Sequence, residues 1–219
     1  MSTAILTGSP VAGSPLESDL RSLGFDVRVA AEPGHVSTEL AGVPAGERVA
    51  LVDPRFVGHA HSLRLALTDP RFPAAAAPGA LTVQPQARAA LTRAFATADR
   101  TVPAASDASG PPQAAVTAPA RSVPDTLAET LAADGVAVHR PELGTLVATV
   151  PADDEARAAA REAVDGVDEE AVRLRSAVKP RDGFFTTFCV SPYSRYIARW
   201  CARRGLTPNQ VTTASLITA

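Results

Sequence analysis

Residues 3–30, TAILTGSPVAGSPLESDLRSLGFDVRVA, contain the clearest indication of the fold class. An apolar run at 3–7 suits a buried strand, and a Gly/Pro loop follows at 8–13. The next segment repeats leucine at helical spacing and ends at Gly24, a natural helix stop. Residues 25–30 then alternate apolar and polar side chains like a second strand. This succession of strand, helix and strand predicts a mostly parallel sheet covered by helices.

The same alternation continues through the first hundred residues. Residues 48–52 (RVALV) form the most strand-like run of the chain and end at Asp53-Pro54. Another strand is predicted at 80–83, and helices are predicted at 37–41, 58–69 and 85–98. We therefore predict an α/β fold, a Rossmann-like sheet that is mostly parallel and has helices on both faces.

A break rich in Pro and Ala interrupts this pattern at residues 100–124 and predicts a disordered loop. Beyond it the sequence predicts helices at 125–133, 152–164 and 169–178, and strands at 136–139 and 145–150. The expected organisation is an α/β domain over residues 1–178, followed by a helical tail over 179–219.

The loop from Gly8 to Gly13 is the first candidate site, because it follows a strand and opens a helix. Free backbone N–H groups at such a place favour anions, so we interpret it as a vestigial phosphate loop. The sequence Ser14-Pro15-Leu16-Glu17 after it reads as a capping box. The loop has neither the spacing of a dinucleotide fingerprint nor the Lys-Ser/Thr of a P-loop, and it contains no cation.

Asp53 is the second candidate, because it follows a buried strand and would lie at the same sheet edge as the loop. One carboxylate without a second at short range does not make a magnesium site. We favour a turn residue before Pro54 and predict no metal site in this chain. The pair His59-Ala60-His61 lies in a helical context that does not suit metal binding.

Residues 191–204 form an amphipathic basic helix pattern. Aromatic and aliphatic side chains, Trp200 among them, recur at spacings of three and four, and a basic stripe contains Arg195, Arg199 and Arg203, with Arg204 beside it. Such a helix suits the surface of an anionic bilayer, although an aromatic stripe is equally typical of a core-facing helix.

Charge is segregated along the chain. From Lys179 onward six basic residues face Asp182 alone, a net charge of +5, which leaves −7 for the remainder of a chain whose net charge is −2. An acidic body with a basic tail is not the broad basic face of a nucleic-acid-binding protein. It suits a soluble domain tethered at an anionic surface. The two cysteines, Cys189 and Cys201, are expected to be reduced, in agreement with a cytoplasmic setting.

Two segments resemble the CDP-alcohol phosphatidyltransferase family: residues 191–195 (SPYSR) and 202–212 (ARRGLTPNQVT). In that family a juxtamembrane helix lies on the cytoplasmic membrane surface, and a Gly-Leu-Thr-Pro-Asn-x-Val-Thr segment opens the first transmembrane helix. The resemblance implies a parent enzyme of phospholipid biosynthesis that transfers a group from a CDP-linked donor to an alcohol and releases CMP. It also implies Mg²⁺ or Mn²⁺ in that parent.

The catalytic signature of that family, D-G-x2-A-R-x8-G-x3-D-x3-D, is absent here. Asp182-Gly183 is followed by residues 184–187 (FFTT) instead of the required Ala-Arg, so no catalytic residue is transferred to this chain. The uncharged run 211–219 is shorter than the roughly 20 residues that span a bilayer. We expect an inactive N-terminal portion, without a cofactor, at the cytoplasmic face of the cell membrane, its transmembrane domain missing.

The N-terminal half resembles the sugar-phosphate nucleotidyltransferases in element order, with the cations of the glycine-rich loop missing. This implies a degenerate relative with a regulatory or structural role. The main alternative is a soluble nucleotide- or sugar-phosphate-binding module whose tail is a dimerisation helix, so a second copy of the chain is a further candidate partner. A third hypothesis is an active nucleotidyltransferase. The absence of cations from the glycine-rich loop argues against it.

Overall fold

The computed structural model describes residues 2–32, 34–101, 122–176 and 204 of the 219-residue chain. It divides into two compact units, Met1–Val167 and Asp168–Ala219. In the second unit, α7 (Glu169–Ser176) begins after Asp168, whose Oδ1 accepts a hydrogen bond from Ala171 N at 3.0 Å. The predicted division after residue 178 falls inside this second unit and stays a prediction. Within the described residues, no helix is both long and apolar enough to cross a membrane.

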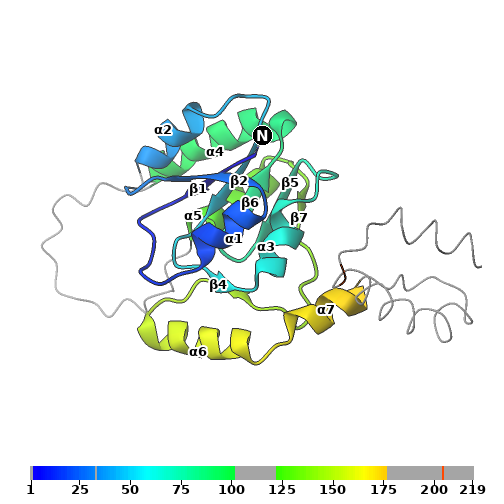
Figure 1. The fold of residues 1–219 in the computed structure, drawn as a ribbon. Helices are drawn as coiled ribbons and strands as arrows, with labels where there is room; N and C mark the ends of the chain where they lie inside the picture. The colour runs from blue at the N-terminus through cyan, green and yellow to red at the C-terminus, as the bar shows by residue number, and fades with distance from the viewer. Residues whose placement is uncertain (1, 33, 102–121, 177–203, 205–219) are drawn as a thin grey trace, which may run out of the picture. The chain divides into compact units, whose positions relative to one another are not determined.

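The first unit is built on a six-stranded sheet in the order β2-β1-β3-β6-β5-β7 (Figure 1). Strand β1 is parallel to β2 and β3, and β7 is parallel to β5, whereas β6 is antiparallel to both of its neighbours. The predicted α/β fold with a mostly parallel sheet is therefore confirmed. The strands are β1 (Ser2–Leu6), β2 (Phe25–Val29), β3 (Arg48–Val52), β5 (Ala74–Ala77), β6 (Ala80–Val83) and β7 (Val138–His139).

Two clusters of buried residues pack helices against this sheet, because successive side chains of a strand point to opposite faces. Ile5 belongs to the cluster that includes α2, α4 and α5, whereas Leu6 belongs to the cluster that includes α1 and α3. In β3, Leu51 likewise belongs to the first cluster and Val52 to the second. The helices are α1 (Leu16–Ser22), α2 (His35–Ala41), α3 (Ala60–Leu67), α4 (Arg88–Thr101), which follows a 3₁₀ turn (Pro85–Ala87), and α5 (Val123–Ala133).

Strand β5 is an element that the sequence analysis missed. Its sequence is Ala-Ala-Ala-Ala, and alanine is depleted in strands, so no local signal marks it. All four residues are buried, and the strand pairs with β6 through a Pro78-Gly79 turn in which Gly79 has φ +74°. This tight hairpin is why β6, whose predicted bounds are confirmed, runs antiparallel within the sheet.

The predicted start of α1, end of α4 and start of α5 were wrong. Ser14 does not form a capping box with Glu17: its Oγ accepts from Leu16 N at 3.4 Å, while Glu17 pairs with Arg21 at 2.6 Å. The break predicted at 100–124 is shorter, because α4 reaches Thr101 and Ser122 caps α5 by accepting from Asp125 N at 3.2 Å. Proline fits the first turn of a helix, so Pro124 opens α5 instead of breaking it. Residues 102–121 lie outside the described part of the chain.

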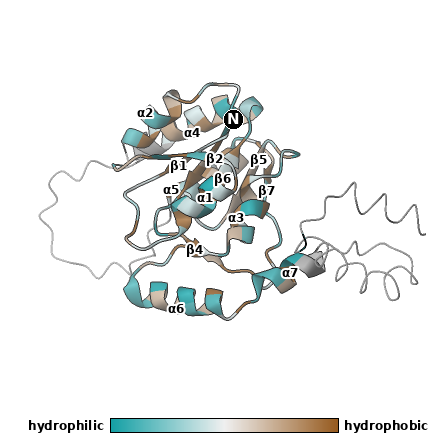
Figure 2. Ribbon diagram, viewed as in Figure 1, coloured by the Kyte–Doolittle hydropathy of each residue, from teal (hydrophilic) through white to brown (hydrophobic). Residues whose placement is uncertain are grey.

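A second, two-stranded sheet joins β4 (Val57–Gly58) to β8 (Ala148–Thr149) in antiparallel fashion. The backbones of the two segments approach so closely that a Cβ on Gly58 would lie 2.5 Å from the Val147 carbonyl oxygen. Glycine is therefore necessary at this position. Helix α6 (Asp154–Asp165) follows and packs against β4, with Asp153 Oδ1 accepting from Ala156 N at 2.8 Å. It has no buried residue, and Figure 2 shows it mainly hydrophilic.

Candidate functional site

The carboxyl ends of β1 and β3 bring the two predicted candidates together. Thr7 N donates to Val52 O at 3.0 Å, which aligns the residues that follow the two strands. A Cβ on Gly8 would lie 3.1 Å from Pro54 Cγ, so the beginning of the loop lies against the turn after β3. The expectation that Gly8 and Asp53 share one edge of the sheet is therefore met in the structure.

The loop between Gly8 and Gly13 has a glycine-dependent turn at its end. Gly13 has φ +73°, and Ser14 N donates to Val11 O at 3.0 Å, which closes the turn before α1. No basic side chain occurs between Gly8 and Leu16. Any charge that balances an anion at this edge must therefore come from another part of the chain.

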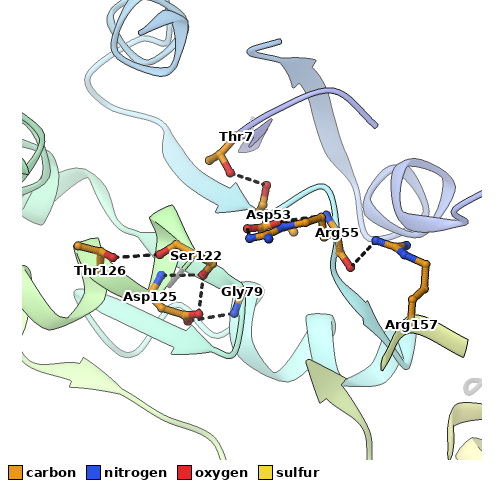
Figure 3. Close-up of polar contacts among 9 residues, drawn as sticks. Thr7, Asp53, Arg55, Gly79, Ser122, Asp125, Thr126 and Arg157 are labelled. Carbon is orange, nitrogen blue, oxygen red and sulfur yellow. Dashed lines mark hydrogen bonds and ion pairs between the residues drawn. The ribbon is translucent and has the colours of Figure 1, made fainter. Parts of the chain in front are cut away.

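Asp53 is held by its neighbour in the turn. Its side chain is 5% exposed, and it accepts hydrogen bonds from Arg55 N at 2.9 Å, Arg55 Nε at 3.1 Å and Arg55 Nη2 at 2.9 Å (Figure 3). The hydrogen bonds to Asp53 raise the pKa of the Arg55 guanidinium. Within the described residues, no group of three or more His, Cys, Asp or Glu side chains could hold a metal ion. This geometry fits the turn role of Asp53 better than a metal role.

Polar contacts extend this edge to helix α5. Asp53 N donates to Gly79 O at 2.8 Å, and Gly79 N donates to Asp125 Oδ1 at 2.9 Å. Ser122 Oγ donates to the other oxygen of Asp125 at 2.5 Å (Figure 3). The Asp125 carboxylate thus ties the start of α5 to the β5–β6 turn, and that turn is tied to Asp53.

Helix α6 supplies arginines to the same side of the molecule. Arg157 Nη2 donates to Arg55 O at 3.3 Å, a contact between residues 102 positions apart in sequence, which Figure 3 shows. Beside it lies a cavity of about 230 Å³ between the start of α1, β4 and α6. The lining residues are Ser14, Pro15, Leu16, Asp19, Phe56, Val57, Gly58, Arg157, Arg161, Val164 and Asp165.

Arg157 and Arg161 were not predicted from the sequence as site residues. Their spacing of four residues places them on one side of α6, but the same spacing is common on any solvated charged helix. Only the packing of α6 against β4 brings these side chains to the sheet edge. The sequence contains no local signal for that contact.

Comparison with known proteins leaves the family open: no family model, no curated protein and no solved structure matches the chain. Of the predicted membrane-surface residues, Arg204 lies in a turn and is exposed. Arg195, Arg199, Trp200 and Arg203 lie outside the described residues. Their assignment rests on the sequence pattern.

Replacing Asp53 by Asn should lower the free energy of unfolding by about 1.5 kcal/mol, because the charge-assisted hydrogen bonds to Arg55 are weakened. The change should be the same with and without Mg²⁺. Urea denaturation of both proteins measures it. The control is Asp26→Asn, whose carboxylate is 65% exposed and should change stability by less than about 0.5 kcal/mol. A wild-type protein that Mg²⁺ stabilises, beside an Asp53→Asn variant that it does not, would restore the metal role.

Proposed function

We propose that this chain is the N-terminal cytoplasmic part of a membrane-bound CDP-alcohol phosphatidyltransferase. The observation that carries the proposal is the segment Gly205–Thr212, GLTPNQVT, which resembles the opening of the family's first transmembrane helix. The basic amphipathic pattern before it supports a helix that rests on the cytoplasmic surface of the membrane. The parent would use Mg²⁺ or Mn²⁺ held by a catalytic signature that this chain does not contain.

For the α/β unit we propose a non-catalytic relative of the sugar-phosphate nucleotidyltransferases. The position of the glycine loop after β1, and of Asp53 after β3, supports this relationship. The loop lacks cations, and the Asp53 carboxylate is engaged by Arg55. These two features favour a regulatory or structural role over nucleotidyl transfer, because triphosphate binding needs charge compensation.

The basic tail would be the part of this chain that contacts the membrane. Arg195, Arg199, Arg203 and Arg204 would contact anionic headgroups, and Trp200 would lie at the interface between headgroups and acyl chains. The tail would then continue into spanning helices. A soluble module that dimerises through the same helix is the competing function, since it would bury the same aromatic stripe.

The reading frame immediately after the codon for Ala219 tests this proposal. The expected result is an open frame that encodes several hydrophobic spans and the D-G-x2-A-R-x8-G-x3-D-x3-D signature. A frame that continues without hydrophobic spans, or without the aspartates, would reject the transferase and favour the soluble module.

A further inference from the structure

The cavity beside α6 combines opposite charges with apolar walls. Two arginines of α6, Arg157 and Arg161, and two carboxylates, Asp19 and Asp165, line it. Most of the other lining side chains are apolar, among them Leu16, Phe56 and Val164. Its volume of about 230 Å³ is below the 300–1,000 Å³ or so of pockets that enclose drug-sized ligands. A small ligand fits it better than a complete nucleotide.

Arg157 uses little of its hydrogen-bonding capacity although it is half-buried. A guanidinium has five N–H donors, yet the described residues supply one acceptor, the Arg55 carbonyl oxygen at 3.3 Å. Its Nη1 atom is buried and has no hydrogen-bond partner in the structure. No carboxylate of the described residues lies within 4.0 Å of it. A half-buried cation without a counter-ion is unfavourable, so an anion in the adjacent cavity would stabilise it.

Arg161 lies one helical turn further along α6 and also lines the cavity. It is exposed and has no ion pair with a described carboxylate. Two arginines at this spacing can bind the same anion, and guanidinium groups match phosphate oxygens in geometry. Ser14, the residue directly after the glycine loop, lines the same cavity, so α6 brings two cations close to a loop that contains none.

Arg88, which lines another hollow of this unit, is an example of an arginine that the fold itself engages. A groove of about 810 Å³ between α2 and α4 includes Arg88. Arg88 donates to Leu40 O at 3.0 Å, to Glu47 O at 3.3 Å and to Val43 O at 3.4 Å. These contacts fix the end of α2 and the loop after it, so Arg88 is occupied by the fold. Arg157 has no comparable set of acceptors.

We propose that this cavity binds a small phosphorylated sugar or polyol. The phosphate would lie on Arg157 and Arg161, ligand hydroxyl groups would donate to Asp19 and Asp165, and the carbon skeleton would contact Leu16, Phe56 and Val164. All residues of the site belong to the unit Met1–Val167, and the site would give this α/β unit a ligand-sensing role. It does not depend on the transferase assignment.

Isothermal titration calorimetry of the full chain with ribose 5-phosphate, ribose and inorganic phosphate tests this site. Ribose 5-phosphate should bind most tightly, inorganic phosphate more weakly, and ribose without measurable heat. Added salt should weaken binding, because Arg161 is exposed and its charge is screened. If neither phosphate compound gives heat at millimolar concentration, or if ribose binds as tightly as its phosphate, the proposal is wrong.

Arginine variants of α6 test whether ribose 5-phosphate binds in this cavity. Arg157→Gln with Arg161→Gln should weaken ribose 5-phosphate by about tenfold or more, and Arg161→Gln alone by about threefold. The matched control is Arg93→Gln on α4, an exposed arginine outside the cavity, which should bind like the wild type. Because Arg161 is exposed, its variant should remain folded even if the double variant does not. Wild-type affinity in Arg161→Gln and in the double variant would place the ligand elsewhere.

Discussion

Replacing Arg195, Arg199 and Arg203 together by Glu should abolish binding to anionic vesicles. Each arginine near an anionic surface contributes about 1 kcal/mol, so losing three should weaken binding by more than about a hundredfold. The three new carboxylates add repulsion from the same surface. Cosedimentation with vesicles that contain anionic lipid, compared with purely zwitterionic vesicles, measures the effect.

A matched control distinguishes the effect of the tail arginines from the effect of the protein's net charge. Arg64, Arg93 and Arg140 are exposed residues of the α/β unit, and their combined replacement by Glu gives a protein of the same net charge. That control should cosediment like the wild type, because the basic stripe of the tail is intact. Equal cosedimentation of the wild type and the tail variant would remove the membrane role of the arginine stripe.

Gly79→Ala should be the most damaging single change at the sheet edge, with a loss of about 2 to 4 kcal/mol in the free energy of unfolding. Gly79 has φ +74°, and a Cβ there would lie 2.2 Å from Val150 Cγ2. Valine has little rotamer freedom to move aside. The same glycine accepts from Asp53 N and donates to Asp125 Oδ1, so a shifted backbone would disturb both contacts.

Gly13→Ala is the matched control for that change. Gly13 has φ +73° but no atom within 4 Å of its built Cβ, so it tests the backbone conformation without the collision. We expect a loss of about 1 kcal/mol for this variant. Urea denaturation of both variants gives the comparison. Equal losses would show that Val150 does not crowd the β5–β6 turn.

The sheet could be predicted where the local signal agrees with the fold. Residues 48–52 and 80–83 are apolar runs bounded by turn residues, and both form strands with the predicted bounds. Strand β5 could not be found, because four alanines have no strand preference and are held in place by β6 and β7. The start of α5 could not be placed from the sequence, because Pro124 is compatible both with a break and with the first turn of a helix.

The candidate site was predictable only in its outline. The rule that parallel strands end at one edge brought Gly8 and Asp53 together correctly. The pairing of Asp53 with Arg55 required knowledge of how the turn after β3 folds, since residues two apart meet only in certain turns. Arg157 lies at this edge because α6 packs against β4. The charged, alanine-rich sequence of α6 contains no local signal for that packing.

Trp200 is the only tryptophan of the chain, so its fluorescence reports directly whether the tail rests on lipid. If the tail rests on lipid, adding anionic vesicles should shift its emission to shorter wavelength and protect it from an aqueous quencher. Zwitterionic vesicles should have little effect. Emission that is already blue-shifted and protected without vesicles, and that stays unchanged when anionic vesicles are added, would show that Trp200 packs inside the protein and not against lipid.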